Sequence, residues 1–470
     1  MTDKRGKSIS LLKNIALFFL ASFIPKAISF FMVPLYTQCL TTAEYGIIDL
    51  VTTTAQLLLP VLTLQVQDAV LRFSMEKSRQ PAQVFSIGLR IVVYGFAILL
   101  IGTGIVHGCG ILILEGKYIT FFLLYYLLGA VHNIFTYFLR AIDKVKHITT
   151  ATVLNSIVTV SCNLLFLLVF RWGVTGYLLA NVLGHLLSLL FLWVSVRLNR
   201  YITFRKPDEV LLKQIVLFSL PMVVSALSWW INNSLDKYIL TWFCGVSASG
   251  LLAVAYKIPT IISIFGSTIS KAFSISVIQD FDSEDSDGFL GQSYATISFL
   301  MVLCASGLML LNIPMSKLLF SNDFFAAWNL VPPLLVSAAM NHMSLSCEHI
   351  CIALNKTKVI SLTAVFGAFV NTILNLCLIP LLDAYGAALA TAIGFFFVWL
   401  VRYIWIRRHV DLKNCRVKEP VSYGLLLGQM VLAYWGNRFL AAQLGCAVVI
   451  MAIYGKEITV IMKKLKMYQK

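Results

Sequence analysis

The sequence predicts an all-α, polytopic membrane protein, and three observations support this prediction. Hydrophobic residues make up 59% of the 470 residues and charged residues 12%, whereas soluble domains have about 45–50% and 25%. The mean hydropathy is +0.85. Long apolar stretches also recur from one end of the chain to the other. The length is therefore used for membrane spans rather than for one water-soluble core.

Fourteen apolar segments are long enough to cross a bilayer. In chain order they run at about 14–36, 46–71, 84–106, 118–139, 150–170, 174–196, 214–235, 249–274, 292–313, 327–352, 359–381, 386–406, 421–437 and 440–462. The first segment is too long for the core of a signal peptide and lacks a clear cleavage site. We therefore expect it to remain as a span, which gives about 14 transmembrane helices.

Basic residues gather on alternate connections between these segments. If the N-terminus lies inside, the inner connections hold clusters such as Arg197, Arg200, Arg205 and Lys206. The outer connections hold only Lys117, Arg171, Lys237, Lys317 and Arg438. The positive-inside rule therefore predicts that both termini are cytoplasmic. Because the net charge of +16 is spread over many short loops, the sequence also excludes a basic domain that binds nucleic acid.

The chain repeats itself at an offset of about 210 residues. Ala141–Lys146 (AIDKVK) matches Ala353–Lys358 (ALNKTK), and the glycine pair Gly176 and Gly184 recurs as Gly386 and Gly394. Each repeat would hold six spans and begin on the inner side, so the copies are parallel, with a cavity between them. We expect an N-lobe at residues 1–206, a C-lobe at 207–406, and two additional spans with a basic tail at 407–470. The glycines suit close helix contacts.

Two lysines inside the apolar segment 249–274 are the strongest candidates for a binding site. Lys257 and Lys271 are fourteen residues apart, so in one continuous helix they share a face and lie about 21 Å apart along the axis. A lysine deep in a bilayer costs at least about 2.5–3.5 kcal/mol and usually faces a watery cavity or a partner. Snorkelling explains Lys271, near its helix end, better than Lys257. We therefore predict that Lys257 lines a functional cavity.

Other ionisable residues also lie within or near the apolar segments. Asp49 and His132 could each bind or carry a coupling proton, although a hydrogen-bonded structural role is the favoured interpretation. Lys26 lies inside the first segment beside Pro25, where a cavity-lining role and a local network at a helix kink stay equally open. Arg90 lies near an inner helix end, where snorkelling explains it.

Two clusters of possible metal ligands are weak candidates. The first comprises His342, Cys347, Glu348, His349 and Cys351. Cys347 and Cys351 share a helix face but His349 points elsewhere, so no metal site is predicted. The second is the acidic inner connection at residues 280–287, which lacks the EF-hand pattern. A solvated linker is the favoured interpretation there.

Motifs of enzymes are absent from the sequence. It contains no Walker lysine loop, nucleophile elbow or metalloprotease helix. The ten cysteines are scattered without paired spacing, which argues against a disulfide framework. We therefore expect no enzymatic activity, no catalytic residues and no cofactor.

Several motifs in both halves resemble one family of membrane proteins. In the first half these are Leu35–Tyr36, Glu44–Gly46 and Gln67–Phe73 (QDAVLRF). In the second half they are Asp236–Leu240 (DKYIL), Gly250, Ala255–Pro259 (AYKIP) and the stretch from Asn375 to Thr391. Over nearly its whole length the chain resembles Wzx-type polysaccharide biosynthesis flippases, which move lipid-linked oligosaccharides. Their superfamily (MOP) includes MATE exporters and lipid II flippases.

The resemblance implies a fold, a substrate and a location. It implies a V-shaped pair of six-helix lobes that open alternately to each side of the bacterial inner membrane. It also implies an anionic substrate, an oligosaccharide on undecaprenyl pyrophosphate, and a glycan polymerase or ligase of the same pathway as a partner. Lys26 would line the N-lobe side of the cavity, and Lys257 and Lys271 would meet the charged head of the lipid. Coupling to H⁺ or Na⁺, the identity of the glycan and the oligomeric state stay open.

Two alternatives remain at this point. A non-transporting component of a glycan pathway, such as a polymerase, is expected to carry a large outer loop, whereas the longest outer connection here is short. A MATE-like exporter of cationic drugs is expected to have acidic residues in its cavity. This chain instead places lysines within its apolar segments, which favours an anionic substrate.

Overall fold

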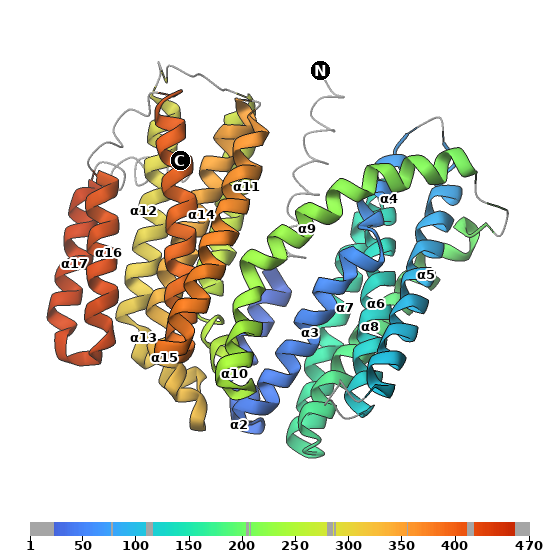
Figure 1. Cartoon of the computed structure of the whole chain (residues 1–470), viewed down its shortest axis with the longest axis horizontal. Helices are drawn as coiled ribbons and strands as arrows, with labels where there is room; N and C mark the ends of the chain where they lie inside the picture. The colour runs from blue at the N-terminus through green and yellow to red at the C-terminus, as the bar shows by residue number, and fades with distance from the viewer. Residues whose placement is uncertain are drawn as a thin grey trace, which may run out of the picture. The chain divides into compact units, whose positions relative to one another are not determined.

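The computed structural model describes residues 23–76, 79–109, 116–203, 206, 208–279, 285, 288–354, 356–410 and 418–455. Throughout these residues the secondary structure is helical, without a strand (Figure 1). The prediction of an all-α protein is therefore confirmed. The described chain forms two compact units, one of Met1–Leu40 and Ile47–Ser234 and the other of Thr41–Gly46 and Leu235–Lys470. The lobe boundary expected at residues 206 and 207 stays a prediction.

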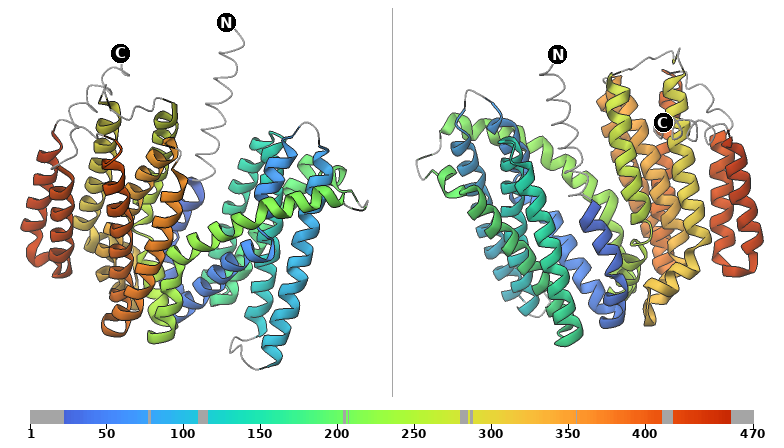
Figure 2. Two further views of the ribbon diagram at one scale, coloured as in Figure 1. Left: turned by 45° about the horizontal axis from the view of Figure 1, so that its top comes forward. Right: turned by 180° about the vertical axis from the view of Figure 1, so that it is seen from behind.

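Long apolar helices build the first unit. They are α2 (Val33–Cys39), α3 (Thr42–Leu62), α4 (Val66–Ser74), α5 (Pro81–Gly108), α6 (Gly116–Ala141), α7 (Val145–Asn163), α8 (Gly173–Val196) and the first part of α9 (Glu209–Cys244). A π-helical turn, η1 (Leu164–Val169), extends α7, and a 3₁₀ turn, η2 (Leu198–Tyr201), follows α8. Figure 2 shows α5 and α6 running side by side. Their core includes Phe85 and Phe138, whose ring centroids are 4.3 Å apart.

The second unit is built in the same way. It contains α10 (Val246–Ala255), α11 (Thr260–Gln279), α12 (Phe289–Leu310), α13 (Asn312–Leu319), η3 (Asn322–Asn329), α14 (Val331–Ala353), α15 (Thr357–Arg407), α16 (Lys418–Tyr434), η4 (Gly436–Phe439) and α17 (Leu440–Ile453). The backbone of Asp383 is non-helical, with φ +50°, and divides α15 in two. Ser298 of α12 lies 2.8 Å from the hydroxyl of Tyr423 and 3.1 Å from that of Tyr454. The last two helices are therefore fixed to this unit by buried hydroxyl groups.

The number of spans differs from the number of apolar segments in the sequence. Within the described residues, eight helices are long and apolar enough to cross a membrane, or up to ten if each of two bent pairs is one span. The predicted fourteen spans are thus not confirmed. Four of the apolar segments are arranged differently in the structure. The segment 46–71 is broken between α3 and α4, 249–274 is broken between α10 and α11, and 359–381 and 386–406 both fall in α15.

The glycines of the sequence repeat occupy close helix contacts in both copies. A Cβ on Gly184 would lie 2.5 Å from Asn155 Oδ1, and a Cβ on Gly394 would lie 3.1 Å from Asn371 Cβ. A Cβ on Gly386 would lie only 2.3 Å from the carbonyl oxygen of Leu378. At Gly386 the neighbouring atoms are backbone, which cannot move aside, so this position requires glycine, whereas at Gly184 the side chains of Asn155 and Thr159 would have to shift.

Candidate functional site

Lys257 lies in a break between two helices of the second unit. The four residues Tyr256–Pro259 separate α10 from α11, and the axes of the two helices are bent by 51°. Pro259 explains the break, because proline has no N–H to donate and its ring clashes with the carbonyl one turn earlier. The N–H of Lys257 donates to the carbonyl of Val254 at 2.9 Å, which is a tighter turn than an α-helix makes. The side chain of Lys257 is half-buried.

The break changes the relationship expected between the two lysines. The prediction of one continuous helix over 249–274 is wrong. Lys257 and Lys271 therefore do not share a helix face by the 3.6-residue period. Lys271 lies in α11, but its side chain is outside the part of the chain that the structure describes. The role of both lysines in binding stays a prediction.

A buried carboxylate holds the break from one side. Asp236, in the last part of α9, is 3% exposed. Its Oδ2 accepts hydrogen bonds from the Tyr256 hydroxyl at 2.9 Å and from Thr391 Oγ1 at 3.4 Å. Lys237 Nζ lies 6.0 Å from the centroid of the Tyr256 ring. Asp236 thus connects α9, the residue next to Lys257, and α15. Asp236 and Thr391 both belong to the motifs that carry the family resemblance, but neither was predicted to be a site residue.

On another side, α10 crosses the first turn of α3 (Thr42–Gly46), which belongs to the same compact unit as α10. A Cβ on Gly250 would lie 2.0 Å from the carbonyl oxygen of Thr42, and a Cβ on Gly46 would lie 2.2 Å from that of Val246. Both glycines belong to the motifs that carry the family resemblance. They are needed because two backbones approach here without room for side chains. The crossing fixes the N-terminal end of the segment that leads to Lys257.

We expect Gly250→Ala to destabilise the protein, because the added methyl group would collide with backbone that cannot move independently. Overpacking of this kind costs about 1–3 kcal/mol. The measurement is thermal unfolding of the purified protein in detergent. Gly307→Ala in α12 is the matched control, since a Cβ there meets nothing within 4 Å. Equal melting temperatures for the two variants would contradict the close crossing.

In the first unit, His132 has a second histidine as its neighbour. The ring centroids of His132 in α6 and His185 in α8 are 5.7 Å apart. Asn155 Nδ2 lies 3.4 Å from His185 Nδ1, and Thr159 donates to Asn155 Oδ1 at 3.1 Å. His132 Nε2 is buried and has no hydrogen-bond partner among the described residues. His185 was not predicted, although its position as an ionisable residue within an apolar segment was a signal that could have identified it.

The other two predicted residues of the first unit are in different environments. Lys26 is exposed, in a helical stretch that precedes α2. Asp49 is half-buried in α3. Lys26 and Lys257 thus belong to different compact units, as do His132 and Lys257. The predicted roles of Lys26 in binding and of Asp49 in coupling remain predictions.

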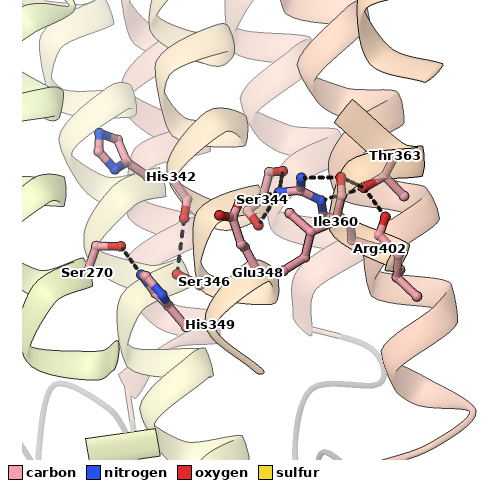
Figure 3. A network of polar contacts seen from close by, with 10 residues as sticks. Ser270, His342, Ser344, Ser346, Glu348, His349, Ile360, Thr363 and Arg402 are labelled. Carbon is pink, nitrogen blue, oxygen red and sulfur yellow. Dashed lines mark hydrogen bonds and ion pairs between the residues drawn. The ribbon is translucent and has the colours of Figure 1, made fainter. Parts of the chain in front are cut away.

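Of the cluster in α14, Glu348 belongs to a polar network around an arginine, and His342 and His349 make separate contacts (Figure 3). Arg402 of α15 is 4% exposed, and its guanidinium donates to Glu348 at 3.1 Å, to Ser344 Oγ at 2.9 Å and to Thr363 at 2.9 Å. His349 Nε2 lies 3.0 Å from Ser270 Oγ of α11. Within the described chain no three histidine, cysteine or acidic side chains are placed to hold a metal ion. The Arg402 network joins α14 to α15, and the contact between His349 and Ser270 joins α14 to α11, so both have a structural role.

One residue of the acidic connection also has a structural role. Asp285 is fully buried, and its two carboxylate oxygens accept hydrogen bonds from the backbone N–H groups of Leu290 and Gly291 at 2.8 and 3.0 Å. It satisfies donors of the first turn of α12 that have no partner within the helix. The expectation of a solvated linker is therefore wrong for Asp285. The acidic residues Asp280, Asp282, Glu284 and Asp287 lie outside the described residues.

Comparisons with known proteins identify a family for this chain and solved structures with a similar fold. Residues 11–278, more than half of the chain, match the family model described as polysaccharide biosynthesis protein. The fold is similar to that of the lipid II flippase MurJ in an inward closed conformation, with a TM-score of 0.68 and 14% identity over 96% of this chain and 99% of that one. No curated protein sequence gives a significant match.

Two further solved structures share the fold. One is an inward-facing multidrug resistance MATE family transporter of the MOP superfamily, with a TM-score of 0.64 and 14% identity over 85% of this chain and 100% of that one. The other is a MOP superfamily transporter from Pyrococcus furiosus, with a TM-score of 0.57 and 16% identity over 86% and 96%. The expected MOP-type transporter fold is confirmed by these likenesses.

Proposed function

The chain belongs to the polysaccharide biosynthesis protein family, and from this premise we propose that it is a flippase for a lipid-linked oligosaccharide. It would move an undecaprenyl-pyrophosphate-linked glycan across the bacterial inner membrane by alternating access. The observation that supports this best is a lysine, Lys257, at a break between two apolar helices. Broken helices form substrate sites in transporters, because irregular backbone at membrane depth needs protein or water around it.

The charge of the site favours an anionic substrate. An ammonium group contributes strongly to phosphate binding through charge-assisted hydrogen bonds. The Asp236 carboxylate beside the break accepts hydrogen bonds from the hydroxyl groups of Tyr256 and Thr391, and its negative charge opposes this preference. Lys271, further along α11, would meet the same head group at another stage of transport, and Lys26 would line the cavity from the first unit. Glycan polymerases or ligases of the same pathway are the partners that would receive the product.

A MATE-like exporter of small cations is the second candidate function. It is favoured by the buried Asp236 carboxylate, a group that would attract a cation. The two functions are separated by transport assays in the same vesicles. A lipid-linked glycan should cross the membrane in the presence of the protein, whereas a fluorescent cation such as ethidium should not be exported. The reverse result would assign the chain to drug export.

For the coupling ion, we propose the proton, with the His132–His185 pair as its binding site. The two imidazole rings have centroids 5.7 Å apart, so they would repel each other if both were protonated. In a membrane interior the pair would therefore carry at most one positive charge. His132 Nε2 is buried and has no hydrogen-bond partner among the described residues, so a proton taken up by this ring would not disrupt an existing hydrogen bond there. Coupling to Na⁺ is the alternative, and Asp49 is the other candidate to carry the ion.

The proposed orientation, with both termini in the cytoplasm, leads to a labelling prediction. A cysteine introduced at Arg408 should be protected from a membrane-impermeant thiol reagent in intact cells, and one at Lys117 should react, after the native cysteines are replaced. The reason is the excess of basic residues on alternate connections. Permeabilised cells provide the control, because both positions should then react. Labelling at position 408 in intact cells would reverse the proposed topology.

A further inference from the structure

The connection that follows α8 is tied to the beginning of α5. The backbone N–H of Thr203 donates to Ser86 Oγ at 2.8 Å. The guanidinium of Arg90 donates from Nη2 to the carbonyl oxygen of Thr203 at 3.2 Å. Leu198 of η2, at the start of this connection, is fully buried. The contact with Thr203 holds the Arg90 side chain in one place. The expectation that this side chain only snorkels toward the membrane surface is therefore incomplete.

A cavity of about 250 Å³ opens beside these contacts. Apart from Ser86, Arg90 and Thr203, its walls are Leu89, Val93, Tyr94 and Ile202. Val93 and Tyr94 are 61% and 67% exposed, and α5 is one of the helices apolar enough to span a membrane. The cavity therefore opens on the face of α5 that lipid would cover. It is smaller than the roughly 300–1,000 Å³ of sites for drug-sized ligands.

The polarity of the cavity changes along its length. A guanidinium and two hydroxyl groups lie where the connection meets α5, beside Leu89 and Ile202, and Val93 and Tyr94 lie about one turn further along the helix. A phospholipid has this order of groups, with a phosphate at the membrane interface and methylenes below it. Tyrosine is enriched at the same interface because its ring is apolar and its hydroxyl is polar.

The local charge favours an anionic lipid over a zwitterionic one. Arg197, Arg200 and Lys206 are exposed on the same connection. Basic residues beside a membrane surface attract anionic lipids. The connection lies on the inner side in the orientation that the positive-inside rule predicts. From these observations we propose that the cavity binds an anionic phospholipid of the inner leaflet, with its phosphate on Arg90 and its first acyl carbons along Leu89 and Val93.

A second cavity nearby shows what distinguishes this site. It measures about 460 Å³ and is lined by Arg79, Asp208, Val210, Leu211 and three glutamines. Arg79 there is paired with Glu76 at 2.7 Å and donates to Gln214 at 2.6 Å. Its walls are mainly polar and include the Asp208 carboxylate, so this larger cavity does not suit a phospholipid. Arg79 therefore provides a matched control for Arg90.

The test is native mass spectrometry of the full chain in detergent, titrated with phosphatidylglycerol or phosphatidylethanolamine. The parent should bind phosphatidylglycerol more tightly, and Arg90→Gln should weaken that binding about ten-fold or more, because a charge-assisted contact is lost. Val93→Trp should weaken it as well by filling the cavity, and it leaves the contact between Arg90 and Thr203 intact. Arg79→Gln and Ile98→Trp should bind like the parent, since Ile98 is 60% exposed on the same helix and outside the cavity.

The results that would overturn the proposal are specific. Binding of phosphatidylglycerol that is unchanged in Val93→Trp would place the lipid elsewhere, and this variant decides the question even if Arg90→Gln does not fold. Equal binding of the two lipids to the parent would remove the preference for an anionic headgroup. Competition by millimolar inorganic phosphate would identify a free anion, rather than a lipid, as the occupant. None of these measurements depends on transport activity.

Discussion

Replacing Lys257 with alanine is expected to reduce export of the lipid-linked glycan by about 10- to 150-fold at equal protein level. The variant would lose a charge-assisted phosphate contact, which contributes about 1.5–3 kcal/mol. The lysine lies half-buried at the break between α10 and α11, where a substrate head group could reach it. The measurement is complementation of a flippase-deficient strain, with the protein quantified by immunoblot.

Two further variants make this prediction specific. Lys257→Arg should restore part of the activity, because it keeps the positive charge but changes the geometry of the contact. Lys317→Ala, at an exposed position of α13 in the same unit, should export like the parent. The melting temperature of Lys257→Ala is measured beside that of the parent, so that a loss of stability is distinguished from a loss of substrate binding. Normal export by Lys257→Ala would show that the lysine is structural.

The fold class could be predicted because it depends on local properties of the chain. A run of apolar residues must become a helix in a membrane, since lipid cannot satisfy backbone hydrogen bonds. The break at Tyr256–Pro259 could also have been predicted, because Pro259 is visible in the sequence and proline interrupts helices. The break between α3 and α4 is different. Leu64 and Gln65 have φ of +53° and +51° there, which is unfavourable for such residues and is not encoded by any local turn signal.

The candidate site could be predicted only in part, because the neighbours of its residues depend on tertiary packing. Lys257 and His132 could be selected from the sequence because an ionisable residue in an apolar segment is costly. Their neighbours depend on which helices pack together. Asp236 accepts a hydrogen bond from Thr391, 155 residues away along the chain. His132 of α6 lies beside His185 of α8. Such pairs follow from tertiary structure, so a single sequence does not reveal them.

The last prediction concerns the coupling proton. In proteoliposomes, a pH gradient of one unit supplies about 1.4 kcal/mol per proton, so one-to-one coupling should raise the accumulation of substrate about ten-fold. We expect His132→Gln and His185→Gln each to abolish this increase while leaving transport down a substrate gradient intact. Glutamine keeps a polar side chain of similar length but does not take up a proton near neutral pH. The measurement compares accumulation with and without the imposed gradient.

One control variant and two contradicting outcomes complete the test of the His132–His185 pair. His107→Gln, at an exposed position near the end of α5, should keep the ten-fold response. If both variants of the pair also keep it, the histidines are structural and Asp49 becomes the residue to test. If a Na⁺ gradient, and not a pH gradient, drives accumulation in the parent, the coupling ion is Na⁺ and the proposed role of the pair is wrong. Because each glutamine variant is tested against passive transport in the same vesicles, loss of folding would be recognised by loss of both activities.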